Sequence, residues 1–280
     1  MRYLDPKNDL TFKKIFGEHP HLVMSLLNSL LPLDVPIVEV SYLTAEQVPQ
    51  IPGLKNSIVD VRCIDQNKRT FIVEMQMFWT DSFKQRVIFN ASKSYVKQIT
   101  KGGEYKGLKT VYALSLVNEI FEPNSKHYYH HYSLVHSFET QKKLEGLEFV
   151  FVELPKFVPA NFEEKKMKVL WLRFLTEILD GTSQIPIELS ENSEIKEALD
   201  ILEESSFSKE ELEEYEKYWD WVQCERSLIS EGEERGKIEG KIEGKIEMIL
   251  EGHRNGFTIE QLATISKLTP EEVVKIISAN

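Results

Sequence analysis

Two acids in neighbouring apolar segments are the residues best placed to do chemistry. The stretch from Ser57 to Met77 reads SIVDVRCIDQNKRTFIVEMQM, which is typical of two β-strands around a polar turn. Period-2 alternation puts Asp60 on one face of the first strand, and Glu74 and Gln76 on one face of the second. The opposite face is predicted to be plain core, made of Val59, Val61, Cys63, Phe71, Val73, Met75 and Met77.

A hairpin closed by residues 65–69 would pair Ile64 with Thr70 and Asp60 with Glu74. Both carboxylates would then point the same way, with their Cβ atoms about 5 Å apart. Like charges that close are destabilising unless a shared proton or a cation neutralises them. Two oxygen ligands on rigid strands suit a hydrated Mg²⁺ or Mn²⁺. We therefore predict a metal site at Asp60 and Glu74; the alternative is that each acid is a solvated edge residue.

The composition is that of a globular protein with a sizeable core: 280 residues, of which 41% are hydrophobic and 28% charged. No run of 18 apolar residues occurs, and the opening MRYLDPKNDLTFKKIFG lacks a continuous apolar segment. We therefore expect neither a membrane span nor a signal peptide. The two cysteines, Cys63 and Cys224, suggest no disulfide framework, which fits a cytoplasmic setting.

The net charge of −11 is unevenly distributed along the chain. Residues 1–158 hold 19 Lys and Arg against 17 Asp and Glu, so their net charge is +2 and that of residues 159–280 is −13. The acidity belongs to the C-terminal half. The part that bears Asp60 and Glu74 is therefore electrostatically free to approach phosphates.

The elements around the hairpin alternate between helix and strand, which predicts an α/β core with a mixed sheet. The helical patterns are an N-terminal one capped by Asn8 and ending before Pro32, one at 81–100, and all of the chain from Phe162 onward. The strand patterns outside the hairpin are 35–42, 110–117, 128–135 and 148–154.

Four segments together carry a resemblance to a known family. They are KNDLTFKKIFG, the hairpin with IVEMQM, the following helix with Arg86 and YVKQITKGGEYKGLKTVYALSLV, and FVELPKF around Glu153. The chain over about 1–160 thus resembles the Rpn recombination-promoting nucleases, also labelled PD-(D/E)XK nuclease family transposases. The resemblance implies a restriction-endonuclease-like core that binds DNA and hydrolyses its phosphodiester bonds with Mg²⁺ or Mn²⁺.

The resemblance also implies roles for individual residues. Asp60 and Glu74 take the positions of the metal-binding acids, Gln76 stands at the lysine position, and Asp9 on the first helix would be a further acid. Val59 stands where the motif has a proline. Because a neutral amide can orient a water but cannot offset charge as a lysine does, Gln76 leaves an alternative open. In that alternative the protein is an inactive nuclease fold that binds nucleic acid or another protein.

Two further groups of residues have more than one interpretation. The basic residues of the helix after the hairpin would contact the DNA backbone, or would form a solvated face; they are Lys84, Arg86, Lys93, Lys97 and Lys101. The histidines of HYYHHYSLVH raise the idea of a zinc site, but alternation separates His130 from His131, and no Cys or acid stands at ligand spacing. A half-exposed strand is the preferred interpretation.

The tail contains an internal repeat in which Gly232, Gly236, Gly240 and Gly244 recur with Lys, Ile and Glu in step. On a helix the Ile stripe lies between a Lys stripe and a Glu stripe. We predict that 231–251 pairs in parallel in a homodimer, with the Lys flank of one copy against the Glu flank of the other. A charged linker is the alternative, because each Gly costs a helix about 1 kcal/mol.

The last segment reads as helix, turn, helix, with Thr258 and Thr269 as caps. It holds two Lys against three Glu, so it lacks a basic surface and a docking role is favoured. The predicted organisation is a nuclease-like domain at 1–160, a helical region at 161–230, the repeat helix or linker at 231–256 and a helix-turn-helix-like segment at 257–280. The predicted function is a metal-dependent DNA endonuclease linked to recombination or mobile elements.

Overall fold

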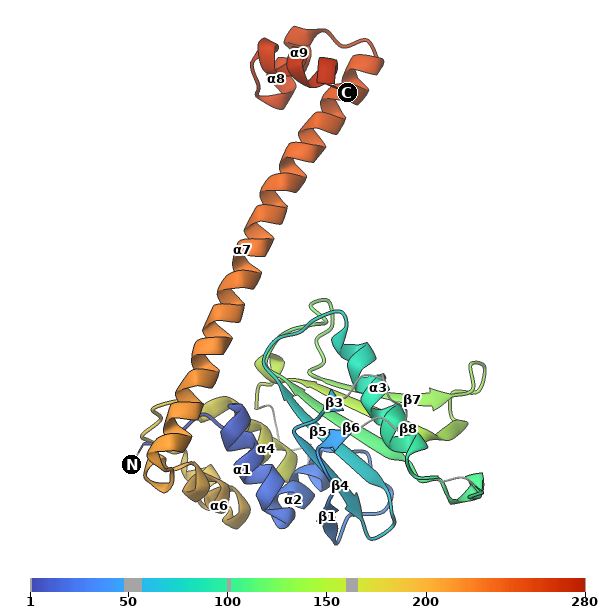
Figure 1. Cartoon of the computed structure of the whole chain (residues 1–280), viewed down its shortest axis with the longest axis vertical. Helices are drawn as coiled ribbons and strands as arrows, with labels where there is room; N and C mark the ends of the chain where they lie inside the picture. The colour runs from blue at the N-terminus through green and yellow to red at the C-terminus, as the bar shows by residue number, and fades with distance from the viewer. Residues whose placement is uncertain (1, 48–56, 100–101, 160–165, 280) are drawn as a thin grey trace. The chain divides into compact units, whose positions relative to one another are not determined.

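The computed structural model describes residues 2–47, 57–99, 102–159 and 166–279. The chain divides into two compact units, Met1–Trp219 and Asp220–Asn280. The first unit is built on a six-stranded mixed sheet with helices packed on it (Figure 1). This confirms the α/β core with a mixed sheet that the sequence predicts.

The sheet has the strand order β1-β4-β5-β6-β8-β7. Strands β5, β6 and β8 are parallel to one another, whereas β1, β4 and β7 join antiparallel. The central strands are covered on both faces, which explains why their sequences are almost continuously apolar. The bounds are β1 (Val40–Tyr42), β4 (Val61–Asp65), β5 (Thr70–Gln76), β6 (Val111–Val117), β7 (Tyr129–Val135) and β8 (Lys143–Glu153).

The hairpin β4–β5 has the predicted register, with Ile64 opposite Thr70 and Val61 opposite Val73. The chain bends at Asp60, however, so the ladder stops one position before Asp60 could pair with Glu74. The residues before the bend form β3 (Ser57–Ile58), which pairs with β2 (Glu46–Gln47) in a separate two-stranded sheet.

The bend also changes the face on which Val59 lies. Alternation predicts Val59 and Val61 on one face, and this is wrong because the strand is interrupted between them. Val59 joins the apolar cluster around Phe83 and Val87 of α3 (Phe83–Val96), whereas Val61 lies within 3.9 Å of the Cβ position at Gly17, on the other side of the sheet.

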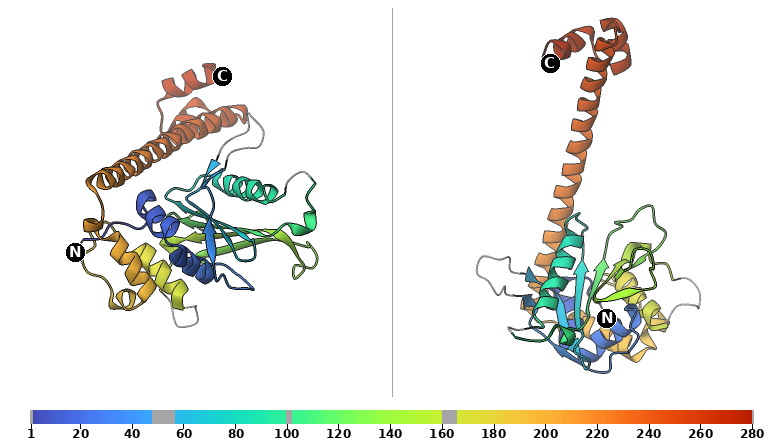
Figure 2. Two further views of the ribbon diagram at one scale, coloured as in Figure 1. Left: turned by 60° about the horizontal axis from the view of Figure 1, so that its bottom comes forward. Right: turned by 90° about the vertical axis from the view of Figure 1, so that its right-hand side faces the viewer.

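Helix α3 covers one face of the sheet, and α1 (Asp9–Glu18), α2 (Pro20–Leu30) and α4 (Lys166–Glu177) cover the other (Figure 2). Asn8 caps α1 as predicted, because its side chain accepts the N–H of Leu10. Pro20 at the start of α2 divides the predicted N-terminal helix in two. The core of this face includes Trp171, whose ring packs edge-on against Phe16 at 5.3 Å between centroids.

The rest of the first unit is helical. It contains α5 (Ile187–Ser190), α6 (Ser193–Leu202), the beginning of α7 (Lys209–Arg254) and the short 3-10 helices Tyr105–Gly107, Leu154–Lys156 and Glu204–Ser206. The beginning of α7 is joined to the N-terminus, because Asn8 donates to the backbone oxygen of Tyr215 and the Asp5 N–H donates to the Tyr215 hydroxyl. From Lys166 to Trp219, the helical region predicted at 161–230 thus belongs to the same compact unit as the sheet, where α4 packs on α2 and α6 packs on α1 and α2.

The second unit consists of the remainder of α7 with α8 (Ile259–Ser266) and α9 (Pro270–Ala279). The glycine repeat is helical and continuous with α7, and a capping box at Thr258 begins α8 as the sequence suggests. A small core of Ile249, Leu262, Ala263 and Val273 holds the three helices together. Among the described residues, no helix combines the length and the apolar content needed to cross a bilayer.

Candidate functional site

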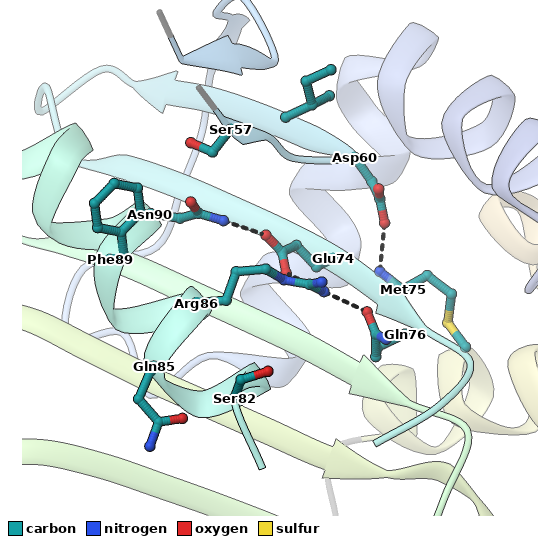
Figure 3. Close-up of a pocket in the computed structure, with 11 residues that line it drawn as sticks. Ser57, Asp60, Glu74, Met75, Gln76, Ser82, Gln85, Arg86, Phe89 and Asn90 are labelled. Atoms are coloured by element: carbon teal, nitrogen blue, oxygen red, sulfur yellow. Dashed lines mark hydrogen bonds and ion pairs between the residues drawn. The ribbon is translucent and has the colours of Figure 1, made fainter. Parts of the chain in front are cut away.

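A cavity of about 670 Å³ lies beside β5, against α3 (Figure 3). Asp60, Glu74 and Gln76, the three hairpin residues singled out from the sequence, all line it. Arg86 and Asn90 of α3 reach into it from the facing side. The structure therefore brings together two of the three predicted acids, Asp60 and Glu74, and one of the predicted basic residues.

Glu74 lies in the middle of β5 and is only 6% exposed. Its Oε1 accepts a hydrogen bond of 3.0 Å from the amide of Asn90. Its Oε2 has no hydrogen-bond partner among the described residues, and it lies 4.0 Å from Nη2 of Arg86. Burial raises the pKa of Glu74, and the charge of Arg86 and the hydrogen bond from Asn90 oppose that rise.

Asp60 sits at the bend between β3 and β4. Its Oδ2 accepts a hydrogen bond of 2.7 Å from the backbone N–H of Met75, so the carboxylate is held beside β5 although Asp60 is outside the ladder. Burial raises the pKa of Asp60 to about 7; the charges of Glu74 and Asp9 add to the rise, while the Met75 N–H and Lys13 oppose it. The charge of Glu74 thus contributes to the raised pKa of Asp60, although burial is the larger cause.

Gln76 has both ends of its amide engaged. Its Oε1 accepts a hydrogen bond of 2.6 Å from Nη2 of Arg86, and its Nε2 donates to the backbone oxygen of Phe78 at 2.7 Å. These two bonds fix the side chain at the mouth of the site, next to Glu74. The same guanidinium therefore contacts both Glu74 and Gln76 (Figure 3).

Helix α3 places Arg86 and Asn90 because they are four residues apart, on one face of the helix. Phe83 and Val87 anchor that helix in the sheet, and the Arg86 guanidinium lies 4.8 Å from the Phe83 ring centroid. Asn90 was not among the residues predicted for the site. The signal in the sequence was that Asn90, a small polar residue, occupies a helix position where the spacing favours an apolar side chain. In the structure Asn90 is buried and only 1% exposed.

Asp9 begins α1 and makes an ion pair of 2.7 Å with Lys13. It is outside the set of residues that line the cavity, but its charge contributes to the raised pKa of Asp60. Tyr218 of α7 is a further residue whose hydroxyl lies within the electrostatic influence of Asp9 and Asp60, and the sequence did not predict it. Burial raises the pKa of its hydroxyl, and the charges of Asp9 and Asp60 raise it further.

The other predicted DNA contacts lie away from the acids. Lys84 pairs with Glu122 at 3.0 Å, and Lys93 donates to the backbone oxygen of Gln47 and to the Ser57 hydroxyl. Lys97 ends α3, and its pKa is lowered by burial and by the positive charges of Arg62 and Lys93. Lys101 lies outside the described residues.

The histidines of β7 have acidic partners on β8 rather than one another. His130 contacts Glu153 at 2.9 Å and His131 contacts Glu148 at 2.5 Å. Glu153 is fully buried and also accepts hydrogen bonds from Lys156 and from the backbone N–H of Phe121. Within the described ranges, no group of three or more His, Cys, Asp or Glu side chains is arranged to hold a metal ion.

The residues of the cavity nevertheless fit a hydrated divalent ion. Magnesium is usually bound through one or two carboxylates, with water and substrate phosphate completing its shell. Asp60 and Glu74 supply hard oxygen ligands, and Oε2 of Glu74 is a buried acceptor that lacks a hydrogen-bond partner in the described part of the chain. A buried acceptor left in this way requires an explanation, and a cation in the cavity is one.

Comparison with known proteins gives one family and no individual relative. A search of curated proteins finds no significant match to this chain. A search of solved structures likewise finds none. The model of the PD-(D/E)XK nuclease family transposases matches residues 6–231, which include the whole sheet and every residue of the cavity. This match supports a nuclease-related or transposase-related role, and by its extent the chain belongs to the PD-(D/E)XK nuclease family transposases.

Proposed function

We propose that this protein is a Mg²⁺- or Mn²⁺-dependent DNA endonuclease that hydrolyses phosphodiester bonds in recombination or mobile-element activity. The main support for the proposal is the pair of acids in the cavity. The cavity contains two acids whose pKa values are raised by burial: Asp60, to about 7, and Glu74, whose Oε2 accepts no hydrogen bond from the described residues. Perturbed acids that converge in a cavity are typical of catalytic sites.

Asp60 and Glu74 would hold the ion, because they are the two carboxylates that line the cavity. A bound divalent ion would supply the positive charge that makes water more acidic and offsets charge on a phosphate. The protein's own groups would then position the reactants. Gln76, fixed by Arg86 and by Phe78, can orient a water or a phosphate oxygen through its amide.

Arg86 adds the cation that Gln76 does not provide. Its guanidinium is half exposed, and it reaches the cavity from α3 beside both Glu74 and Gln76. A guanidinium has donors in a planar fork that matches phosphate oxygens. We assign Arg86 to the DNA phosphate, whereas Lys84, Lys93 and Lys97 would contact the backbone further along the helix.

The setting of the proposed reaction follows from the same residues. Residues 1–158, which include every residue of the site, have almost no net charge, so this part of the unit can approach DNA. Both Cys63 and Cys224 are free thiols, which fits a cytoplasmic enzyme. A homodimer formed through the C-terminal helical region would suit an enzyme that cuts two strands.

A second candidate function is an inactive nuclease fold that binds nucleic acid or protein. One specific observation favours it: both ends of the Gln76 amide are already hydrogen-bonded within the protein. If those bonds persist when DNA binds, Gln76 is a structural residue and no group on β5 orients a water.

Plasmid nicking distinguishes the two functions. The wild type is incubated with supercoiled DNA in Mg²⁺, in Mn²⁺ or in EDTA, beside Asp60→Ala and Glu74→Gln. Asp81→Asn is the matched control, because Asp81 is an exposed acid just before α3 and outside the lining set. We expect nicking by the wild type and the control only with metal, and none by the site variants. Nicking by Asp60→Ala at the wild-type rate would refute the assignment. DNA binding without nicking would favour the second function.

A further inference from the structure

Helix α7 carries a stripe of four apolar and two charged residues that begins before the glycine repeat. The stripe became evident because the helix is continuous from Lys209 to Arg254. Its residues are spaced alternately by three and four positions, as in a coiled-coil seam. They are Cys224, Leu228, Glu231, Arg235, Ile238 and Ile242.

The apolar members of this seam face solvent. Leu228 is 58% exposed, Ile238 52% and Ile242 53%. Single exposed apolar residues are ordinary, but a row of them along one face of a helix marks an interaction surface. The pattern continues through the charged Lys245 to Ile249, and Ile249 is fully buried in the core that α7 forms with α8 and α9, so the exposed apolar part of the seam ends at Ile242.

A parallel pairing of two copies in register brings identical residues together. Glu231 would meet Glu231 of the second copy, and Arg235 would meet Arg235. Both layers lie in the middle of the seam, where like charges are destabilising. The parallel pairing expected from the repeat alone therefore places two repulsive layers side by side.

An antiparallel pairing centred at position 233 replaces both repulsive layers with attractive ones. Glu231 of each copy then lies opposite Arg235 of the other, which gives two ion pairs related by the two-fold axis. The same register places Leu228 opposite Ile238 on both sides of the centre. It also places Cys224 opposite Ile242, so all six seam residues have complementary partners.

The positions that flank the seam add acidic contacts in both orientations. A parallel pair would bring Glu234 beside Glu239 of the second copy. The antiparallel pair would bring Glu225 beside Glu239 and Glu234 beside Glu234 of the second copy, so the solvent-exposed flanks slightly favour the parallel pair. The layers inside the seam, where charges are more strongly desolvated, decide between the orientations.

We propose that the occupant of this seam is a second copy of the same chain, bound antiparallel through residues 224–242. The charge pattern selects the orientation, since the antiparallel register pairs both central charged residues, Glu231 and Arg235, with an opposite charge, whereas the parallel register pairs each with its own kind. The proposal concerns self-association and does not depend on whether the protein cleaves DNA.

Thiol crosslinking of the full-length protein tests the orientation, because Cys224 is exposed and Cys63 is buried. In the antiparallel pair, Cys224 lies opposite Ile242 and about 27 Å along the helix from Cys224 of the other copy, at about 1.5 Å per residue. A short bismaleimide should therefore leave the wild type uncrosslinked and should crosslink Ile242→Cys into a dimer. The control Cys224→Ser/Ile242→Cys should not crosslink.

The opposite pattern would overturn the proposal. A parallel pair would crosslink the wild type through Cys224, and it would crosslink the Cys224→Ser/Ile242→Cys control through position 242. A wild type that remains monomeric in light scattering at tens of micromolar would refute the seam altogether.

Exchanging the central charges provides an independent test. Glu231→Arg places two arginines opposite each other in the antiparallel pair, so the dimer dissociation constant should rise about tenfold or more. The double variant Glu231→Arg/Arg235→Glu should restore dimerisation, because it recreates the pair in reverse. If the double variant dissociates as readily as the single one, the two positions do not face each other.

Discussion

Arg86 Nη2 donates a hydrogen bond of 2.6 Å to Oε1 of Gln76 and lies 4.0 Å from Oε2 of Glu74. The resemblance places Gln76 at the lysine position of the family motif, and β5 itself contains no lysine or arginine. Helix α3 brings one to the same place from a different element. A positive charge is thus present in the cavity, but Arg86 of α3 supplies it instead of a lysine on β5.

This relationship predicts that cleavage depends on Arg86 more than on Gln76. Arg86→Ala should lower the single-turnover rate by about two orders of magnitude, as does loss of one group that stabilises developing charge. Arg86→Lys should recover part of the rate, because a point charge replaces a fork of donors. Gln76→Ala should lower the rate less, without abolishing metal binding.

The control for this series is Lys106→Ala, which removes an exposed cation remote from the cavity. Rates are measured with excess enzyme in Mg²⁺, and metal binding is followed separately by calorimetry. An Arg86→Ala variant that cleaves as fast as the Lys106→Ala control would show that the guanidinium has no part in the reaction.

The raised pKa of Asp60 predicts a pH-dependent penalty on the metal-free fold. A carboxyl whose pKa rises from 3.8 unfolded to about 7 folded favours folding only while it is protonated. That contribution is complete below about pH 4 and is lost as the pH rises to about 7. Asp60→Asn keeps the shape without the charge, so it should raise the melting temperature in EDTA at about pH 8.

The melting temperature of Asp60→Asn should rise by about 2–4 °C for each kcal/mol of unfolding free energy that the substitution recovers in a protein of this size. It should shrink at about pH 5, where the wild-type carboxyl is mostly protonated. Thermal melts of both proteins at the two pH values give the comparison. An Asn variant that melts below the wild type at the higher pH would mean that the charge of Asp60 is already satisfied by the protein.

The sequence was a good guide to the sheet because its signals there are local. Alternation and the polar turn determine the register of Ile64 with Thr70, and the run VYALSLV marks β6. Strand ends were less predictable, since they depend on neighbouring strands. The expected strand at 35–42 shrinks to Val40–Tyr42, and β8 begins at Lys143 because it pairs with β7.

The candidate site was only partly predictable for a related reason. Asp60 and Glu74 stand out as acids in apolar runs, and both line the cavity. The bend at Asp60 and the hydrogen bond from Met75 arise because β3 pairs with β2 instead of continuing β4. The alternation of apolar and polar residues does not predict this change of partner. Asn90 likewise contacts Glu74 only because α3 packs against β5, and this packing could not be predicted from the sequence.

A metal bound by the two acids should stabilise the protein through linkage. At a metal concentration a hundredfold above Kd, the free energy of unfolding should rise by about 2.7 kcal/mol. Asp60→Asn should show a much smaller rise, because one ligand loses its charge. Melting curves in EDTA and in Mg²⁺ or Mn²⁺ measure both. Equal metal-induced shifts in the two proteins would show that Asp60 and Glu74 do not share a cation.

The fully buried carboxylate of Glu153 predicts an opposite pH dependence, at a distinct part of the same sheet. Burial acts to raise its pKa, but hydrogen bonds from Lys156, from His130 and from two backbone N–H groups outweigh burial, so its pKa is lowered. The contribution of the Glu153 charge to stability is therefore present above the unfolded pKa of about 4.5 and is lost as the pH falls below that value.

Glu153→Gln removes the charge and leaves Lys156, which still donates to the backbone oxygen of Glu122, without its ion-pair partner, and this should cost about 3–5 kcal/mol near neutral pH. Urea unfolding measures that cost beside Glu139→Gln, an exposed control that should be close to neutral. The difference between Glu153→Gln and the wild type should narrow at about pH 4, and a difference that stays constant with pH would mean that shape, rather than charge, holds this end of β8.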